Sequence, residues 1–224
     1  MGSVSGRLVL VGSGEFAQIA CEYFDHDSDY DVVAFAVERD YLHQTELLGR
    51  PVVAWEELQQ THPPGEVELF IAIPASQLNR LRARFHAEAK LRGYRFATYI
   101  SSRAFVWRNA QIGENCFIFE GNVVQPFVRI GNDCVLWSGN HIGHRSVIHD
   151  HVFIASHAVV SGYCEIGARS FIGVNATFKD GVKVAEDNVI GAGALVTHDT
   201  EPGRVYVGSP AQAVPDRSSL QVRL

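Results

Sequence analysis

The sequence lacks a long hydrophobic run. No apolar stretch approaches the roughly 18 residues that a membrane span needs. The first six residues, Met1-Gly2-Ser3-Val4-Ser5-Gly6, contain neither the basic start nor the apolar segment of a signal peptide. We therefore expect a cytoplasmic protein that is not inserted in a membrane.

Clusters of basic residues are also missing. The 224 residues include 19 Lys and Arg against 25 Asp and Glu, which gives a formal net charge of −6. Binding to nucleic acid through counterion release depends on clustered Lys and Arg. We therefore expect no nucleic-acid partner.

Closely spaced cysteine pairs are missing as well. The four cysteines, Cys21, Cys116, Cys134 and Cys164, show no CxxC spacing. A chain without a secretion signal has no reason to form disulfides. We expect all four cysteines to be reduced thiols.

What the sequence does contain is a repeat with a period of six. Sixteen residues taken in steps of six, from Val106 to Val196, are all apolar. In a chain that is 46% hydrophobic, chance produces such a run in a given frame about four times in a million. An α-helix repeats every 3.6 residues and a flat strand every 2. The period of six therefore predicts a parallel β-helix with three short faces per coil, in roughly five coils of about 18 residues.

The positions between the steps agree with this prediction. Residues four positions beyond each step are small or medium-sized, as a narrow interior requires. Three of the four cysteines occupy such positions, so we expect these three in the core. Asn115, residues 132–133 and residues 187–188 suit tight turns. Six glycines directly follow a step, where we expect corners that need a permissive backbone. These are Gly113, Gly131, Gly143, Gly167, Gly173 and Gly191.

The first hundred residues have a different pattern. Residues 8–11 read as a strand, followed by the turn Gly12-Ser13-Gly14 and a helix through Tyr23, and a second strand over residues 31–37 ends at Glu38. A glycine turn followed by an acidic residue some twenty-odd positions later is typical of a nucleotide-binding unit. Ala17 replaces the third glycine of the dinucleotide fingerprint, so a turn that only joins strand to helix remains the alternative.

The rest of this region continues an α/β pattern. Residues 67–73 predict a buried strand, Ser76 caps a helix that ends at Gly93, and residues 96–100 predict a last strand. We therefore predict a small Rossmann-like α/β domain over residues 1–102. The β-helix domain follows over residues 103–224.

The Ile-Gly steps, as in Ile112-Gly113 and Ile130-Gly131, resemble the hexapeptide-repeat acyltransferases, whose fold is a left-handed β-helix. The segment Val205-Tyr206-Val207-Gly208-Ser209-Pro210-Ala211 is similar to the closing Gly-x-Pro-Ala of that family. With both domains counted, the chain resembles the NeuD/PglD-like sugar-nucleotide acetyltransferases of bacterial surface-glycan synthesis, lipopolysaccharide included. The resemblance implies a homotrimer that uses acetyl-CoA, needs no metal, and acetylates the amino group of a nucleotide-linked amino sugar.

The resemblance also implies sugar-nucleotide contacts in the N-terminal domain. Backbone N–H groups of Gly12, Ser13 and Gly14 would face the phosphates. Glu38 would accept hydrogen bonds from the base or the ribose, with Asp40 as its competitor.

Acetyl-CoA would lie along the β-helix, between neighbouring subunits. By alignment with the family, the backbone N–H of Gly162 would bind the thioester carbonyl. Gly173, Gly191, Ala192 and Gly193 would let the pantetheine arm approach the backbone.

Acetyl transfer to an amine needs a base and donors for the developing oxyanion, and histidine is the natural base at neutral pH. Aligned by its hexapeptide steps, His144 falls where the family has its catalytic histidine, and His141 is the rival. Two positions depart from the family: Arg145 stands where an acidic residue commonly follows the base, and Phe153 where a second histidine lies near the acetyl group. The remaining clustered histidines are expected at solvated corners, with His157 the exception because it stacks above Gly139.

Three other functions stay open. Transfer to a sugar or sialic-acid hydroxyl would need a stronger base, because a hydroxyl is a poorer nucleophile than a neutral amine. The histidine cluster is also compatible with a γ-class carbonic anhydrase, in which three histidines from two subunits hold zinc. A non-catalytic scaffold would show no thioester turnover.

Overall fold

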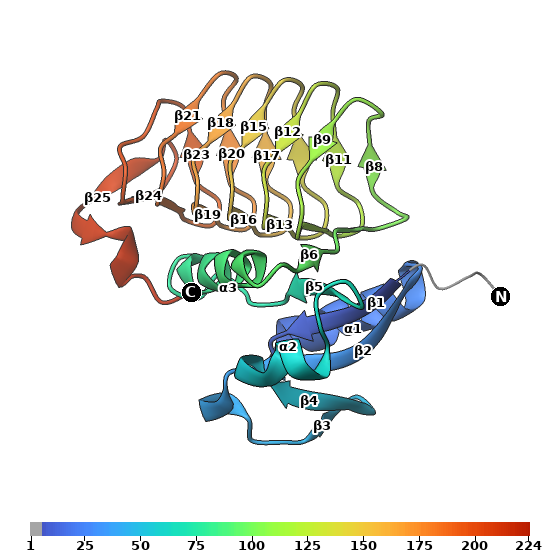
Figure 1. Cartoon of the computed structure of the whole chain (residues 1–224). Coiled ribbons are helices and arrows are strands. Elements are labelled where there is room, and N and C mark those ends of the chain that lie inside the picture. The colour runs from blue at the N-terminus through green and yellow to red at the C-terminus, as the bar shows by residue number, and fades with distance from the viewer. Residues whose placement is uncertain (1–5) are drawn as a thin grey trace. The chain divides into compact units, whose positions relative to one another are not determined.

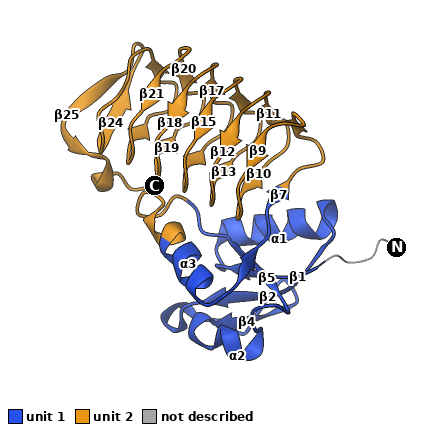
Figure 2. Ribbon diagram, turned by 45° about the horizontal axis from the view of Figure 1, so that its top comes forward, with its two compact units in different colours: residues 1–74, 84–99 blue, residues 75–83, 100–224 orange. Residues whose placement is uncertain are grey.

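The structure is a computed structural model that describes residues 6–224. The described chain forms two compact units (Figure 2): unit 1 comprises residues 6–74 and 84–99, and unit 2 comprises residues 75–83 and 100–224. Across residues 6–224, no helix combines the length and the apolar character that crossing a membrane demands.

Unit 1 is built on a six-stranded sheet with the order β3-β4-β2-β1-β5-β6. The strands are β1 (Gly6–Val11), β2 (Tyr30–Val37), β3 (Glu46–Leu47), β4 (Arg50–Ala54), β5 (Glu68–Ile71) and β6 (Arg95–Phe96). All pairs are parallel except the β3–β4 hairpin. The chain runs from β1 to β2 on one side and to β5 on the other, and ligands of open α/β sheets bind at such a reversal, beyond the carboxyl ends of the strands.

Three helices accompany this sheet: α1 (Glu15–Asp27), α2 (Leu58–Thr61) and α3 (Arg80–Leu91), of which residues 80–83 belong to unit 2. The single-turn segments η1 (Arg39–Tyr41) and η2 (Trp55–Glu57) complete the unit. Helix α1 buries Phe16, Ala17, Ala20, Cys21 and Phe24, which lie on one helical face. The Phe24 ring packs 5.5 Å from that of Phe70 on β5, and burying such a side chain contributes about 1.5–3 kcal/mol.

Unit 2 is a three-sided β-helix whose coils stack side by side (Figure 1). The first face holds β8 (Phe105–Val106), β11 (Val123–Val124), β14 (His141–Ile142), β17 (Val159–Val160), β20 (Thr177–Phe178) and β23 (Leu195–Val196). The second face holds β9 (Gln111–Ile112), β12 (Arg129–Ile130), β15 (Val147–Ile148), β18 (Glu165–Ile166) and β21 (Lys183–Val184). The third face holds β7 (Tyr99–Ile100), β10 (Phe117–Ile118), β13 (Val135–Leu136), β16 (Phe153–Ile154), β19 (Phe171–Ile172), β22 (Val189–Ile190), β24 (Arg204–Val207) and β25 (Gln212–Ser218).

The predicted period of six is confirmed. Each strand from β8 to β23 ends on one of the apolar steps, and strands 18 residues apart pair in parallel, as Phe117 does with Val135. Ile118, Leu136 and the later steps are buried in one continuous core. Alternate residues of a strand point to opposite sides, so the residue before each step faces outward.

The cysteines of unit 2 lie in this core, as predicted. Cys116, Cys134 and Cys164 are buried, reduced thiols. Burial raises the pKa of the Cys134 thiol well above its ordinary value and also raises that of Cys164. Because the thiolate is the nucleophilic form, these two side chains are not placed for nucleophilic catalysis.

The corners differ from the expectation in one respect. Left-handed backbone occurs at the third residue after a step, and Asn115, Asp133 and Asp187 occupy it as predicted for tight turns. None of the six glycines that directly follow a step has a positive φ. A Cβ on Gly143 would instead lie 2.5 Å from the carbonyl carbon of Ser161. The expectation that these positions need a permissive backbone is therefore wrong. Glycine is required there because the coils stack too closely to leave room for a Cβ.

The predicted helix cap at Ser76 is also wrong, because α3 begins four residues later. Residues 77–79 adopt left-handed backbone with φ between 51° and 61°. Leu78 packs against Val189 within unit 2, and the Asn79 side-chain amide donates to the carbonyl oxygens of Arg169 and Ser170. These tertiary contacts hold a conformation that local sequence disfavours.

The strands of the N-terminal region differ from the prediction in two respects. The single strand expected over residues 96–100 is divided between β6 and β7, which belong to different sheets. The β3–β4 hairpin was not predicted. Leu48 and Gly49 form its two-residue turn, and both have positive φ. Gly49 was the sequence signal for such a turn.

Candidate active site

His144 lies in the corner between β14 and β15. We call the edge between the first and second faces, which contains this corner, the first edge. The His144 ring stands over Gly162 of the next coil, so closely that a Cβ on Gly162 would lie 2.5 Å from the ring Cε1. The ring also packs against Tyr163, with centroids 5.1 Å apart and planes at 82°. The exposed imidazole is thus confined between the glycine and the tyrosine of the same neighbouring corner.

Gln125, in the preceding coil, fixes the imidazole from the other side. The His144 backbone N–H donates to Gln125 Oε1 at 2.9 Å, and the ring Nδ1 lies 3.3 Å from the same oxygen. Because an amide oxygen only accepts hydrogen bonds, this contact places the ring proton on Nδ1 and leaves Nε2 able to accept one. Gln125 thus holds the ring in one orientation, and no pattern in the sequence indicated this contact.

Arg145 does not pair with the imidazole. Its backbone is left-handed, with φ of 60°, and its guanidinium lies 4.6 Å from the centroid of the Phe127 ring. The residue that replaces the family's acidic neighbour thus engages an aromatic side chain.

His141 lies on the first face, in strand β14, just before the corner that carries His144. It faces outward from β14 and pairs in register with Val123 and Val159. Among residues 6–224, no hydrogen bond to its ring fixes a tautomer, in contrast to His144. The geometry therefore favours His144 as the base, and His141 stays the alternative.

The other clustered histidines are held elsewhere. His149 Nε2 lies 2.8 Å from Glu165, and His151 Nδ1 lies 2.8 Å from the buried carboxylate of Asp133. The His157 ring stacks on Gly139, as the sequence predicted, at the edge between the third and first faces. None of them shares the corner of His144.

The Gly162 backbone N–H, the expected donor to the thioester carbonyl, already has an acceptor. It donates to Asp180 Oδ1 at 2.8 Å. Asp180 is exposed and lies on the same edge, one coil further on. A thioester oxygen at this position has to share the proton with the Asp180 carboxylate or displace it.

The remaining predicted CoA contacts lie on another edge. Gly173 and residues 191–193 occupy corners between the third and first faces, not the first edge. A Cβ on Gly173 would lie 2.6 Å from the Ala192 nitrogen, so coil stacking alone requires glycine there. Ala192 and Gly193 are exposed, and within one chain they are not brought to His144.

In unit 1, the glycine turn lies at the carboxyl end of the central strand β1. Gly12 has φ of 124°, and a Cβ there would lie 2.7 Å from the Ala72 carbonyl oxygen, so only glycine fits. Ser13 is half-buried, and the exposed Gly14 directly precedes α1. The turn therefore leads into a helix N-terminus, which favours anions.

The two acidic candidates differ in their surroundings. Glu38 follows β2 and forms an ion pair with Arg84 at 2.9 Å. Asp40 is exposed on η1. A ligand that hydrogen-bonds to Glu38 therefore meets a carboxylate that Arg84 already holds in place.

We predict that Gly162→Ala lowers kcat about tenfold or more while the protein stays folded. The added methyl group meets the His144 ring, which is a movable side chain, so the ring and not the coil gives way. Misplacing a catalytic group by about 1 Å costs up to roughly 10²-fold. Steady-state kinetics and circular dichroism would check this. Ser161→Ala, one residue earlier and away from the ring, is the control, and equal kcat values for the two variants would contradict the prediction.

Comparisons with known proteins concern the fold and the repeat. The bacterial transferase hexapeptide (six repeats) family matches residues 109–144, 127–162 and 163–198. The acetyltransferase domain of PglB from Neisseria gonorrhoeae is 24% identical, with a TM-score of 0.85, over 94% of this chain and 100% of that one. PerB from Caulobacter crescentus, solved with CoA and GDP-perosamine, is 25% identical, with a TM-score of 0.80, over 94% of this chain and 98% of that one.

Curated relatives match only the β-helix half or less. Gamma carbonic anhydrase 1 of Arabidopsis thaliana is 31% identical over 132 residues, which cover 51% of this chain and 46% of that protein. A tetrahydropyridine-dicarboxylate N-acetyltransferase of Staphylococcus aureus is 33% identical over 31% of this chain and 33% of that protein. The chain thus spans less than half the length of these relatives.

Proposed function

We propose that this chain, a left-handed β-helix with an N-terminal α/β unit, is an acetyl-CoA-dependent sugar N-acetyltransferase. Its substrate is a nucleotide-linked amino sugar. The observation that carries the proposal is the His144 ring, held by Gln125 and packed on Gly162 with Nε2 left to accept a proton. The likeness to PerB extends over both units, whereas the carbonic anhydrase match covers 51% of this chain.

The proposed reaction needs one proton acceptor. The amine nitrogen attacks the thioester carbonyl carbon, and His144 Nε2 takes the proton that the nitrogen loses. The carbon–sulfur bond then breaks, and the imidazolium returns the proton to the leaving CoA thiolate. The Gly162 N–H stabilises the oxyanion once it is shared with or released by Asp180.

Gly12, Ser13 and Gly14 are the proposed phosphate contacts of unit 1, with Glu38 or Asp40 for the base or ribose. Gly173, Gly191, Ala192 and Gly193 are the proposed contacts of the pantetheine arm. The position of the turn, at the sheet reversal and before α1, supports the first assignment. From the same residues we propose that unit 1 binds the nucleotide and unit 2 binds acetyl-CoA.

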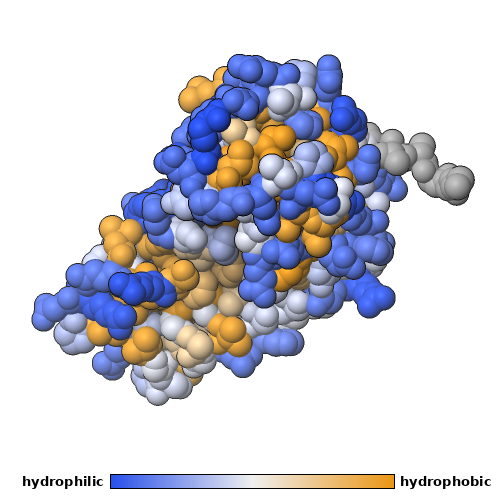
Figure 3. All heavy atoms as spheres, turned by 90° about the horizontal axis from the view of Figure 1, so that it is seen from below, coloured by the Kyte–Doolittle hydropathy of each residue, from blue (hydrophilic) through white to orange (hydrophobic). Residues whose placement is uncertain are grey.

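A homotrimer is the proposed assembly. Large apolar side chains are exposed along the first face and first edge, at 52% for Phe105, 40% for Trp107 and 60% for Tyr163. An interface that covers the first edge would remove Phe105, Trp107 and Tyr163 from water. On the side seen from below in Figure 3, apolar residues also reach the surface between polar ones. The role in surface-glycan synthesis and the cytoplasmic location stay predictions from the sequence.

A thiol-release assay with acetyl-CoA and a panel of UDP-, dTDP- and GDP-linked amino sugars tests the proposal. We expect release of CoA with at least one amino sugar and an acetyl product that resists mild alkali, as an amide does. An alkali-labile product would show O-transfer, and no release with any sugar would contradict the acetyltransferase.

A zinc-dependent carbonic anhydrase is the second candidate, because the sequence match to that class favours it. Within the described residues, no group of three or more His, Cys, Asp or Glu side chains is placed to hold a metal ion. Such a site would have to form between subunits. Stoichiometric zinc in the purified protein, with CO₂ hydration, would favour this candidate.

A further inference from the structure

The carboxylate of Asp180 reaches the same residue that the His144 ring covers. Asp180 Oδ1 accepts the Gly162 backbone N–H at 2.8 Å. From the preceding coil, the His144 ring stands over this glycine, and its Nε2 atom would lie 2.8 Å from a Cβ added there. Together with the bond lengths of Gly162 itself, these contacts place Nε2 and Oδ1 no more than about 8 Å apart. The candidate base and an anion thus meet at one residue of the first edge.

Asp180 has a second oxygen that is open to a ligand. A carboxylate accepts hydrogen bonds through both of its oxygens, and within residues 6–224 no group donates one to Oδ2. No Lys or Arg of the described chain forms an ion pair with Asp180, although Lys179 precedes it directly in the sequence. The side chain is exposed, so a solute can reach it. Asp180 therefore offers a negative charge beside the candidate base.

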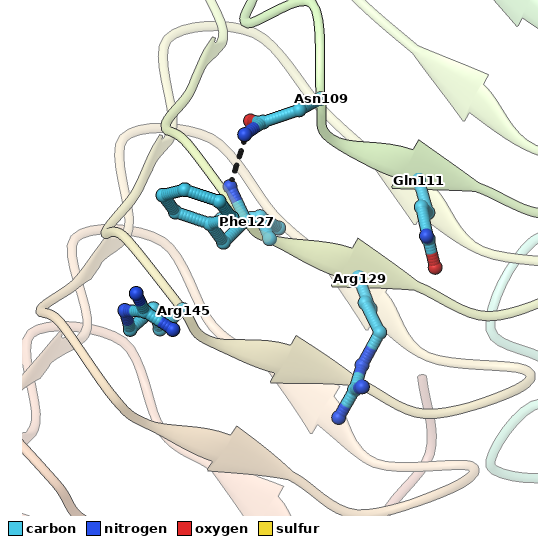
Figure 4. Close-up of a pocket in the computed structure, with 6 residues that line it drawn as sticks. Asn109, Gln111, Phe127, Arg129 and Arg145 are labelled. Atoms are coloured by element: carbon cyan, nitrogen blue, oxygen red, sulfur yellow. Dashed lines mark hydrogen bonds between the residues drawn. The ribbon is translucent and has the colours of Figure 1, made fainter.

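The arginine that follows the base does not neutralise this charge. The Arg145 guanidinium lies 4.6 Å from the centroid of the Phe127 ring. Both side chains line a pocket of about 280 Å³ on the first edge (Figure 4). The other lining residues are Asn109, Gln111, Val128 and Arg129, so neither His144 nor Asp180 belongs to this pocket.

We propose that Asp180 binds the ammonium group of the amino-sugar acceptor, an inference that rests on the proposed function. An aliphatic amine is largely protonated at neutral pH, as the Lys side chain is. A sugar hydroxyl carries no charge at this pH. The Asp180 carboxylate therefore favours an amine over a hydroxyl at the same place, which makes it a specificity residue for transfer to nitrogen.

The protons balance in this arrangement. One of the three N–H protons of the ammonium passes to bulk water, which leaves the neutral amine that attacks the thioester carbon. His144 Nε2 takes the second proton as the carbon–nitrogen bond forms, and returns it to the CoA thiolate when the carbon–sulfur bond breaks. The third proton stays on the amide nitrogen. Asp180 takes up no proton and holds the nitrogen beside the base.

Calorimetric titration tests this without requiring turnover. The full chain and its Asp180→Asn variant are titrated with UDP-, dTDP- and GDP-linked amino sugars, with CoA, and with UDP-glucose, dTDP-glucose and GDP-mannose, whose sugars carry only hydroxyls. An Asn oxygen can still accept the Gly162 N–H, so the variant removes the charge and keeps the corner. We expect Asp180→Asn to bind the preferred amino sugar roughly tenfold more weakly, with the hydroxyl sugars and CoA unchanged. The difference should shrink at high salt.

Asp150→Asn is the matched control. Asp150 Oδ1 accepts the backbone N–H of Asn132 at 2.7 Å, across the same spacing of 18 residues that separates Gly162 from Asp180. This pair lies on the edge between the second and third faces, away from His144. We expect Asp150→Asn to bind every ligand as the wild type does.

The other outcomes contradict the proposal. Equal wild-type affinity for amino and hydroxyl sugars, or a preference for the amine that survives in Asp180→Asn, would overturn it. A loss of the same size for the hydroxyl sugars or for CoA would show a general effect on the corner instead. No binding of any nucleotide sugar would overturn this inference and the proposed function together. A preference for amines that Asp180→Asn removes, in a protein that releases no CoA in the thiol assay, would leave the role of Asp180 standing while the proposed function fails.

Discussion

His144→Ala is expected to lower kcat by at least roughly 10²-fold, the usual scale for losing a general base. The imidazole is exposed on the first edge and makes no core contact, so its removal leaves the apolar steps and their stacking intact. Its Nε2 atom faces no competing partner among the described residues, because the one ring hydrogen bond uses Nδ1. Steady-state kinetics with the best amino sugar and circular dichroism would measure the two effects.

His141→Ala is the control for this prediction. It removes an imidazole from the same region, three residues away, that no hydrogen bond orients. We expect its kcat to stay within about tenfold of the wild type, below the loss expected for the base. Near-normal turnover in His144→Ala together with an inactive His141→Ala would move the base to residue 141.

Arg82→Met is expected to have the largest effect on stability. Arg82 and Asp133 form an ion pair in which both side chains are fully buried, with Nε and Oδ1 3.1 Å apart. Without the guanidinium, the Asp133 carboxylate keeps its contacts with Asn115 and His151 but loses the ion pair with Arg82. Breaking such a pair on one side costs about 3–5 kcal/mol. Chemical denaturation would measure this loss in the free energy of unfolding.

Arg80→Met provides a matched comparison on the same helix. Arg80 pairs with Asp187 at 2.9 Å, but the Arg80 side chain is 37% exposed. Partly solvated pairs of this kind contribute about 0–1 kcal/mol. An Arg82→Met variant no less stable than Arg80→Met would show that burial of the Arg82 pair does not control the stability of the fold.

The candidate site was only partly accessible from the sequence. The stacking of coils every 18 residues is regular enough that the contact of His157 with Gly139 could be inferred directly. Gln125 precedes His144 by 19 residues, so its side chain reaches across the coil instead of stacking on it, and no hydropathy pattern reports that direction. The bond from Gly162 to Asp180 was missed for a different reason: the two residues stack at the regular spacing of 18, but the bond depends on the Asp180 rotamer at an exposed corner.

The sequence by itself determined the β-helix. Each inward residue is fixed by a short-range pattern, and each coil packs on a near copy of itself, so periodicity alone specifies both register and core. Tertiary structure decided what the pattern leaves free: the start of α3, the burial of Arg82 and the setting of His144. All three features depend on which side chains from distant segments meet, either at the corners of the coils or outside the repeat. At those places hydrogen bonds and ion pairs outweigh local backbone preference.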